Sequence, residues 1–393
     1  MAVITRLYRL AALVAVALVL GACSSTDGEE EQGPAPLVDF DAERKFVKVW
    51  SASVGDGQGS LYTRLNPVVD GNTIYVAAVD GQVKAVSRST GKTLWDNNVE
   101  KQIVGGIGVG ENILLVGTVK GEVLALNKAD GERLWMVEVG GEVLAAPQTD
   151  NDRVYVQTFD GQLVGLNIDN GERVWSYRHT LPILTLRGTS TPLMMRGTLV
   201  AGFANGQVVS FDAETGAVRW SVRVAVAKGD SEIQRIIDID GALLEENGVV
   251  YAVSYQGKVV AIDPASGRKL WSNDASSYAG MSSGFGNIYV SGEDGSVTAF
   301  EKSGQGARWA QTVLARRKLS GSATLSSYVV VGDFDGYIHA LSQVDGHVAA
   351  RTRVDSGGIQ VDLQTFDDML LVYSNDGKLV AYKLEEPTSG KFF

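Results

Sequence analysis

One short pattern recurs along most of this chain, and it restricts the possible fold more than any other feature. Each copy has an apolar run, a pair such as Asp-Gly, a second alternating run, another Gly and then an aromatic position. The glycines of the first pair are Gly81, Gly121, Gly161, Gly206, Gly257, Gly295, Gly336 and Gly377. Their period of about 40 residues is typical of β-propeller blades, so eight copies predict eight blades.

A tryptophan follows the glycine at a constant offset of 14 residues in the first six copies. These residues are Trp95, Trp135, Trp175, Trp220, Trp271 and Trp309. The seventh copy has Ala350 at this place. A large ring at one fixed position of every repeat can cover the apolar area between neighbouring blades.

The first copy shows why each repeat predicts four strands. Residues 74–79 read as a buried strand, and Asp80-Gly81 supplies the positive φ angles of a tight hairpin turn. An alternating strand follows, and residues 93–95 begin an outer strand after a second turn. Small-residue stretches ahead of each copy, such as residues 145–147, are candidates for the innermost strand. Each repeat is therefore expected to be a four-stranded antiparallel blade.

The two ends of the repeat region predict how the ring closes. Residues 45–50 resemble an outer strand with no strands before it, whereas the last copy, residues 376–384, stops after its third strand. The N-terminal strand is therefore expected to complete the last blade and to protect two sheet edges. The sequence predicts an all-β, eight-bladed propeller over residues 41–386, with a C-terminal tail at 387–393.

The N-terminal region reads as a lipoprotein signal. Arg6 and Arg9 precede an apolar run at residues 10–20, which is typical of a secretory signal and short for a transmembrane span. Leu20-Gly21-Ala22-Cys23 resembles a bacterial lipobox, in which the Cys is acylated, and Cys23 is the only cysteine. The alternative is an ordinary signal peptide with an incidental Cys. We expect a signal peptide at 1–22, and an acylated Cys23 with a flexible tether at 23–40.

Composition and charge exclude several classes of function. The formal net charge of −11 argues against nucleic acid, whose binding requires Lys and Arg at the phosphates. The three histidines are scattered, which disfavours a metal site. Asp-Gly pairs occur once per repeat, so they favour hairpin turns over calcium loops. We therefore expect no metal, no cofactor and no catalytic residue.

One enzymatic alternative has support in the sequence. Residues 261–271 resemble the blade motif of quinoprotein dehydrogenases, which bind pyrroloquinoline quinone in the central funnel of an eight-bladed propeller. The blades here are near minimal length, and a single cysteine excludes the vicinal disulfide found in many of those enzymes. We interpret the motif as shared architecture. A ligand-sensing propeller is a second alternative, although the expected inner strands are mainly small or aliphatic.

Two connectors break the period, and departures from a repeat are candidate functional sites. They span residues 175–191 and 220–241 and join the outer strand of one blade to the inner strand of the next. Because they belong to consecutive blades, they should lie side by side on the face of the Asp-Gly hairpins. They carry apolar residues, an arginine and two acids, namely Leu184, Leu186, Ile236, Arg187, Asp238 and Asp240. We predict a protein interface; the alternative is that the apolar residues cap the core.

At these connectors the chain resembles the BamB family, the propeller lipoproteins of the outer-membrane β-barrel assembly machinery. The resemblance rests on residues 184–188, 231–233 and 238–240, together with the lipobox and the eight short blades. Gly241-Ala242-Leu243 departs from the family pattern. The resemblance implies a non-enzymatic scaffold at the periplasmic face of the outer membrane. That scaffold binds the POTRA domains of BamA and assists the folding and insertion of β-barrel proteins.

The resemblance also implies which residues bind the partner. Carried over position by position, the BamA-binding residues are Leu184, Leu186, Arg187, Asp238 and Asp240. Arg187 is expected either to pair with a carboxylate of the partner or to brace Asp238 and Asp240. Direct contact of strand edges with nascent barrel proteins by β-augmentation is a further hypothesis.

Overall fold

A computed structural model describes residues 33–59 and 63–387 of the chain. The chain divides into two compact units, 1–34 and 35–393, and the second contains the repeats. The expected signal peptide and Cys23 lie outside the described residues. No described helix is long and apolar enough to cross a membrane.

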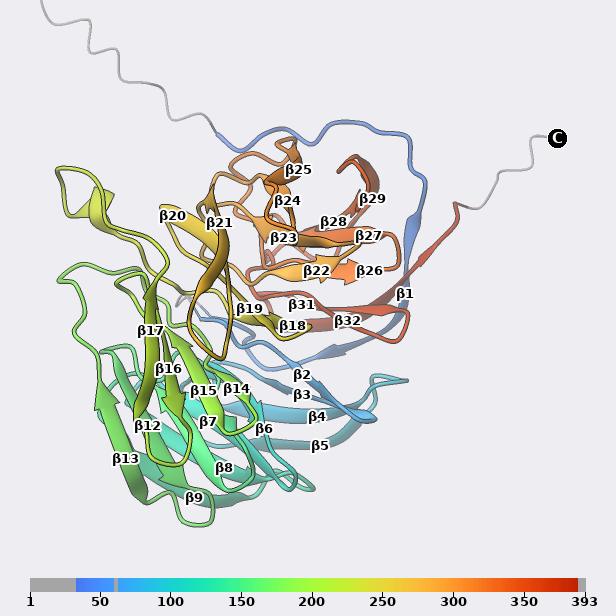
Figure 1. Cartoon of the computed structure of the whole chain (residues 1–393). Helices are drawn as coiled ribbons and strands as arrows, with labels where there is room; N and C mark the ends of the chain where they lie inside the picture. The colour runs from blue at the N-terminus through green and yellow to red at the C-terminus, as the bar shows by residue number, and fades with distance from the viewer. Residues whose placement is uncertain (1–32, 60–62, 388–393) are drawn as a thin grey trace, which may run out of the picture. The chain divides into compact units, whose positions relative to one another are not determined.

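Within the described residues, the strands of the second unit form eight four-stranded antiparallel sheets (Figure 1). Blade 1 consists of β2 (Val68–Asp70), β3 (Thr73–Ala77), β4 (Gln82–Ser87) and β5 (Thr93–Asn98). Blade 2 consists of β6 (Ile103–Val109), β7 (Ile113–Thr118), β8 (Glu122–Asn127) and β9 (Arg133–Glu138). Blade 3 consists of β10 (Gln148–Thr149), β11 (Arg153–Gln157), β12 (Gln162–Asn167) and β13 (Arg173–Arg178). Blade 4 consists of β14 (Leu193–Met195), β15 (Thr198–Gly202), β16 (Gln207–Asp212) and β17 (Val218–Arg223).

The second half of the unit continues in the same order. Blade 5 consists of β18 (Leu244–Glu246), β19 (Val249–Val253), β20 (Gly257–Ile262) and β21 (Lys269–Ala275). Blade 6 consists of β22 (Ser282–Gly284), β23 (Asn287–Ser291), β24 (Val297–Glu301) and β25 (Ala307–Gln311). Blade 7 consists of β26 (Ala323–Leu325), β27 (Tyr328–Gly332), β28 (Tyr337–Ser342) and β29 (Val348–Arg353). Blade 8 consists of β30 (Gln364–Phe366), β31 (Met369–Tyr373), β32 (Lys378–Glu385) and β1 (Lys45–Ser53).

Blade 8 closes the ring in the way that the sequence predicts. Strand β1 pairs antiparallel with β32, from Lys45 opposite Glu385 to Ser53 opposite Lys378. The first and last strands of the propeller therefore protect each other's edges. The eight-bladed fold class and its closure by the N-terminal strand are confirmed.

Tryptophan side chains fasten a blade to the next one at seven of the eight junctions. The Trp135 indole N–H donates to the carbonyl of Ile168 at 2.7 Å, and its ring packs over Gly171 in the following turn. Gly171 has φ +75°, and a Cβ there would lie 2.8 Å from the Trp135 ring, so this turn requires glycine. The same hydrogen bond is made by Trp50, Trp95, Trp175, Trp220, Trp271 and Trp309. We call this arrangement the tryptophan clamp.

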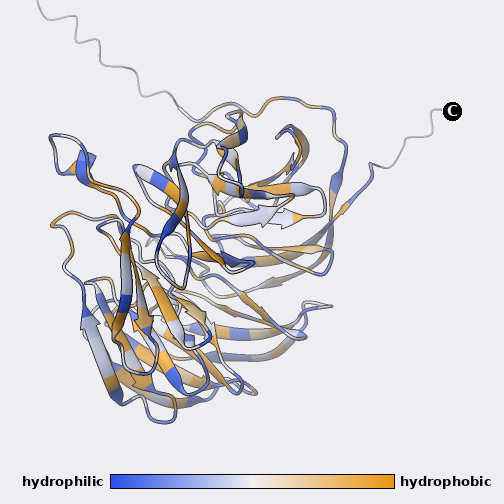
Figure 2. Cartoon of the chain, viewed as in Figure 1, coloured by the Kyte–Doolittle hydropathy of each residue, from blue (hydrophilic) through white to orange (hydrophobic). Residues whose placement is uncertain are grey.

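The core lies in the middle of each blade. All six residues of β7 are buried, whereas side chains of the outer strand β5 alternate between exposed and half-buried. Figure 2 shows the same trend, with hydrophobic residues in the middle strands and hydrophilic residues at the outer strands and turns. The connectors between blades therefore begin and end on a well-packed scaffold. Such a scaffold can hold the side chains of the connectors in fixed positions.

Candidate partner-binding site

The two long connectors leave the propeller on the face of the Asp-Gly hairpins. The first lies between β13 and β14, and the second lies between β17 and β18 and contains the short 3-10 helix η1 (Ile233–Arg235). Both are seen at the upper left of Figure 1. Each joins an outer strand to the inner strand of the next blade, as the sequence predicts.

Hydrogen bonds and close packing join the two connectors. The backbone N–H of Leu186 donates to Asp238 Oδ2 at 2.5 Å, and Ser190 Oγ donates to the carbonyl of Gly241 at 2.9 Å. A Cβ at Gly188 would lie 2.6 Å from the Asp240 carboxyl carbon, so the first connector passes directly over that acid. The expectation that the connectors lie side by side is confirmed.

Both acids of the second connector are buried. Asp238 is 0% exposed and Asp240 is 4% exposed, and Asp238 Oδ1 has no hydrogen-bond partner in the described part of the chain. Burial, together with the charge of Asp240, raises the pKa of Asp238 to about 8 against the opposing hydrogen bond from the Leu186 N–H. Burial also raises the pKa of Asp240 to about 6, against the opposing charge of Arg64. These two acids therefore face the interior and hold the first connector from below.

Arg187 has a partner that the sequence did not suggest. Its Nη1 lies 2.6 Å from Glu142 Oε2, in the connector between β9 and β10, and both side chains are about one third exposed. Arg187 pairs with Glu142 and not with Asp238 or Asp240, so the proposed brace between Arg187 and the two aspartates is not what the structure shows. Glu142 was missed because the repeat pattern of its own blade is regular there, and only the fold brings it near Arg187.

The exposed part of this site is apolar. Ile183 is fully exposed, Leu184 is 40% exposed and Ile233 is 67% exposed, whereas Leu186 is half-buried. Ile236, which the sequence suggested as an interface residue, is only 7% exposed and packs into the fold, so that part of the prediction is wrong. In the second connector, Val226 and Ile233 face outward, whereas the chain turns inward after η1 and buries Ile236, Ile237 and Ile239.

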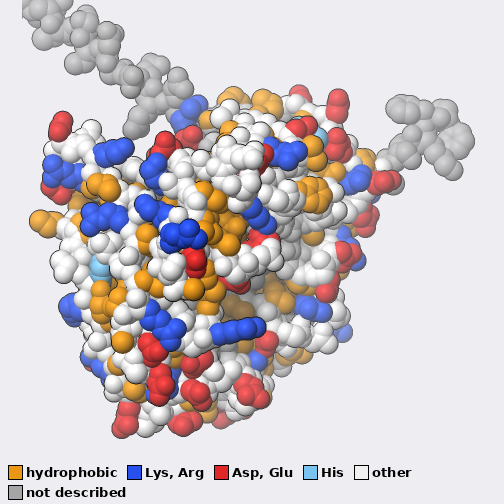
Figure 3. Space-filling view, in the orientation of Figure 1, with side chains coloured by type: hydrophobic (Ala, Val, Ile, Leu, Met, Phe, Trp, Pro, Cys, Tyr) orange, Lys and Arg blue, Asp and Glu red, His pale blue; other side chains and the backbone are white. Residues whose placement is uncertain are grey.

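We call Glu142, Ile183, Leu184, Leu186, Arg187 and Ile233 the connector surface. Figure 3 shows hydrophobic side chains beside Lys and Arg at the upper left, where the long connectors lie. Apolar residues around a charged pair are typical of protein-protein interfaces. Among residues 33–59 and 63–387, no group of three or more His, Cys, Asp or Glu residues could hold a metal ion. The arrangement is suited to docking a protein.

Contacts between side chains in the middle of the ring can be compared with the quinoprotein alternative, which places a cofactor there. Arg64, which precedes blade 1, donates to the carbonyls of Asp240 and Tyr278, which precede blades 5 and 6 on the opposite side of the ring. Asp362, which precedes blade 8, accepts hydrogen bonds from Asn66 Nδ2 at 3.4 Å and from the Gly280 N–H at 3.1 Å. These side chains meet across the centre, where a funnel-bound cofactor would need space.

Fold and site together define a class, a β-propeller of short quinoprotein-like repeats with a composite connector surface on one face. A family model described as outer membrane protein assembly factor BamB matches residues 79–311 and 293–386. The chain belongs to the BamB family. A Pseudomonas aeruginosa protein of that name is 55% identical over 377 residues, covering 96% of this chain and 99% of that protein. The Escherichia coli protein is 34% identical, with 93% and 96% covered.

Solved structures agree with this assignment. The crystal structure of BamB from Moraxella catarrhalis has a TM-score of 0.79 and 29% identity, covering 86% of this chain and 99% of that one. A quinohemoprotein alcohol dehydrogenase from Comamonas testosteroni has a TM-score of 0.67 at 13% identity, covering 88% and 78%. At that identity the second likeness concerns the fold alone.

Proposed function

We propose that this chain is a non-enzymatic scaffold subunit of the outer-membrane protein assembly complex. It binds the POTRA domains of BamA and assists the folding and insertion of β-barrel proteins into the outer membrane. One observation carries the proposal, namely that the two connectors of the family resemblance form one continuous surface, joined by the hydrogen bond between Leu186 and Asp238. A surface built from two connectors and supported by a rigid scaffold is what a specific protein interface requires.

The residues of this site divide into two roles. Ile183, Leu184 and Arg187 are exposed or partly exposed, and we assign them to direct contact with the partner. Asp238 and Asp240 are buried, so we assign them to holding the first connector in its binding conformation. In the complex, Arg187 remains beside Glu142 and presents its other guanidinium nitrogens to an acceptor on the partner.

Attachment to the membrane is assigned to Cys23. The Leu20-Gly21-Ala22-Cys23 sequence supports acylation of this residue, and Ser24 supports sorting to the outer membrane. Several acyl chains, each contributing about 0.8 kcal/mol per buried CH₂, hold a protein firmly on a bilayer. The propeller is then retained at the periplasmic face, where its effective concentration for BamA is high.

A pull-down with the tagged, detergent-solubilised chain tests the interface. Arg187→Ala is expected to weaken the binding of BamA by about 2–5 kcal/mol, because it leaves Glu142 unpaired at a covered interface. Asp238→Ala is expected to weaken it as well, by releasing the first connector, whereas Asp238→Asn keeps an acceptor for the Leu186 N–H and should bind normally.

Val344→Ala is the matched control for these variants, because Val344 is a 60% exposed residue in the turn between β28 and β29, on the opposite face of the propeller. It should recover as much BamA as wild type. If a folded Arg187→Ala chain also recovers BamA like wild type, the assignment of this surface is wrong.

Direct contact with nascent barrel proteins is a second proposal. The outer strands of several blades expose apolar side chains, among them Leu94 at 57% and Leu134 at 55%. An outer strand with an open edge can pair with an extended segment of another chain. Photo-crosslinkers at these two positions should capture unfolded barrel proteins in cells, and the absence of such adducts would leave BamA as the partner of this chain without a direct substrate contact.

A further inference from the structure

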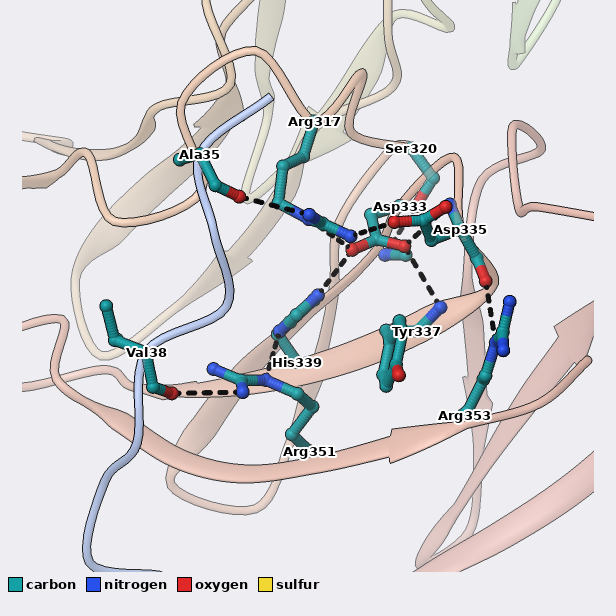
Figure 4. Close-up of polar contacts among 11 residues, drawn as sticks. Ala35, Val38, Arg317, Ser320, Asp333, Asp335, Tyr337, His339, Arg351 and Arg353 are labelled. Atoms are coloured by element: carbon teal, nitrogen blue, oxygen red, sulfur yellow. Dashed lines mark hydrogen bonds and ion pairs between the residues drawn. The ribbon is translucent and has the colours of Figure 1, made fainter. Parts of the chain in front are cut away.

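The segment before β1 packs against the propeller instead of leaving it. The Ala35 N–H donates to the carbonyl of Ala315 at 2.9 Å, and the carbonyl of Ala35 accepts from Arg317 Nη1 at 3.1 Å. Three residues later, the carbonyl of Val38 accepts from Arg351 Nη1 at 3.1 Å. Figure 4 shows both arginines reaching toward this segment. Residues 35–40, which the sequence assigned to the tether, thus lie along blade 7.

Side chains and further backbone contacts continue this packing up to β1. Leu37 packs on the apolar cluster that contains Leu314 and Leu319, and the Phe40 ring lies 4.9 Å from the Arg351 guanidinium. The N–H groups of residues 43 and 44 both donate to the carbonyl of Ala349, in the outer strand of blade 7, at 3.0 and 3.1 Å. We call residues 35–44 the strap.

The strap rests on a fixed cluster of charges. Arg317, with a 4% exposed side chain, lies 2.7 Å from Asp333 Oδ2 through Nε and 2.7 Å from Asp335 Oδ2 through Nη2. His339 Nε2 lies 2.9 Å from the same Asp333 oxygen, and Arg351 Nε donates to His339 Nδ1 at 3.2 Å. Two carboxylates therefore hold Arg317 directly, and His339 links Arg351 to Asp333, so the strap supplies carbonyl oxygens to guanidinium groups that are already oriented (Figure 4).

The strap lies at the junction that has no tryptophan clamp. Blade 7 has Ala350 where the other outer strands have Trp, and the clamp would need a turn between the third and fourth strands of blade 8. That turn does not exist, because β32 and β1 come from opposite ends of the chain. Phe46 of β1 packs there instead, with its ring 6.0 Å from that of Tyr382 in the apolar cluster that contains Ala350.

We propose that the strap fastens blade 7 to blade 8 at this junction, as the tryptophan clamp fastens neighbouring blades at the other seven junctions. It ties blade 7 to β1, and thereby to blade 8, through backbone hydrogen bonds, Leu37 and Phe40. It also fixes the place where the N-terminal segment leaves the propeller. Ala35 contacts the connector before β26, so this place is on the face of the Asp-Gly hairpins, which also carries the connector surface.

A docked strap shortens the link to the lipid anchor. Only twelve Cα–Cα steps separate Cys23 from Ala35, a span of at most about 45 Å even when extended. If the strap were released, twenty-two steps would separate Cys23 from Lys45, and the limit would rise to about 80 Å. This second part of the inference rests on the acylation of Cys23 under the proposed function, whereas the fastening of blade 7 does not.

Hydrogen exchange and thermal unfolding of the full chain in detergent test the fastening. Leu37→Asp places a carboxylate in an apolar contact and should release the strap. The amides of Ala35, Glu43 and Arg44 should then exchange at least about tenfold faster, and the melting temperature should fall by about 2 °C or more. Exchange should also rise in β29 and β1 and stay unchanged in blade 4. Phe40→Ala is a milder variant with the same expected pattern.

Val38→Asp is the matched control, since the Val38 side chain is 45% exposed and the strap uses only its carbonyl. It should leave exchange and melting unchanged. The fastening is overturned if Leu37→Asp frees the strap amides while β29, β1 and the melting temperature stay as in wild type. Binding of BamA should be unaffected by Leu37→Asp, so failure of the strap and failure of the proposed function give different results.

The same amides test the shortened link on a bilayer. The acylated chain is bound to phosphatidylethanolamine–phosphatidylglycerol vesicles, and the exchange of Ala35, Glu43 and Arg44 is compared with that in detergent. Retained protection is the expected result. Loss of protection on vesicles would show that the strap is released at the membrane, and would overturn its role in fixing the exit of the N-terminal segment.

Discussion

Two buried aspartates on the same face of the propeller have opposite protonation behaviour. Asp238 supports the connector surface and Asp333 supports the strap, and both are 0% exposed. Burial alone would raise the pKa of Asp333, but hydrogen bonds and charge from His339 and Arg317, together with the Tyr337 N–H, lower it below the usual value of 3.8. Burial and the charge of Asp240 raise the pKa of Asp238 to about 8, and only the hydrogen bond from the Leu186 N–H opposes this rise. Partners, and not depth, decide whether a buried acid is charged.

The two sites also differ in how much buried charge holds them together. The charged cluster under the strap would lose much of its stability if one member were removed, because the remaining charge would be buried without compensation. The first connector is held by the hydrogen bond from the Leu186 N–H to Asp238, by that from Ser190 Oγ to the carbonyl of Gly241 and by the Arg187–Glu142 pair, and Asp238 Oδ1 has no partner within the described residues. Loss of the Asp238 contact should therefore cost less stability than loss of a member of the charged cluster, which leaves a buried charge uncompensated.

The largest expected effect follows from breaking the charged cluster. Asp333→Asn leaves Arg317 Nε and His339 without their carboxylate, and should lower the free energy of unfolding by about 3–5 kcal/mol. Urea denaturation at pH 7 measures this change. Asp335→Asn is the control, because that carboxylate is 43% exposed and should matter much less. Equal and small effects of both substitutions would contradict the account of Asp333.

An intermediate effect is expected where the first connector crosses Asp240. Gly188→Ala brings a methyl group to 2.6 Å from the Asp240 carboxyl carbon, and the connector must move away. Overpacking of this kind costs about 1–3 kcal/mol, and the shifted connector should also bind BamA less well. Gly188 has no positive φ, so its effect is steric; Gly197→Ala, at φ +75° with no heavy atom near its Cβ, is the reverse case, with backbone strain but no clash, and should leave BamA binding unchanged. Unchanged BamA binding by Gly188→Ala would show that the connector position is not critical.

The pH dependence of stability should have opposite sign at the two acids. Asp238 binds its proton more tightly in the folded chain, so its contribution to stability falls as pH rises from about 4 to about 8. Asp238→Asn removes this loss, which is at most about 1.4 kcal/mol per pH unit. The variant should come closest to wild type near pH 4 and exceed it increasingly up to pH 8. Asp333, whose pKa is lowered, contributes stability above pH 4 that is lost as pH falls further.

Urea denaturation of wild type, Asp238→Asn and Asp333→Asn across this pH range measures both slopes. The difference in the free energy of unfolding between each variant and wild type isolates the contribution of one acid from those of the other titrating groups. A constant difference for Asp238→Asn between pH 5 and pH 8 would mean that Asp238 is ionised throughout and that its pKa is not raised.

Much of the fold could be predicted because it repeats. The fixed offset from Gly81 to Trp95, and from each later glycine to its tryptophan, defines the blades locally, and the truncated last copy reveals the closure. The two long connectors could also be found, since they interrupt a regular period. These are features that neighbouring residues determine, and they need no knowledge of distant contacts.

What the sequence did not reveal depends on residues far apart in the chain. Glu142 reaches Arg187 only because two connectors converge, and Asp238 is buried only because the first connector passes over it. The strap looked like a tether, since residues 24–40 are polar and acidic, but Leu37 and Phe40 find apolar and cationic partners on blade 7. Composition gives no sign of such long-range contacts.

The assignment of the connector surface to BamA is tested most directly by site-specific crosslinking in cells. A photo-crosslinking amino acid is placed at Ile183 or Ile233, which are exposed on the connector surface, and at Val344 on the opposite face. We predict adducts with the POTRA region of BamA from the first two positions and none from Val344. Efficient adducts from Val344, or none from Ile183 and Ile233 in an assembled complex, would contradict the account.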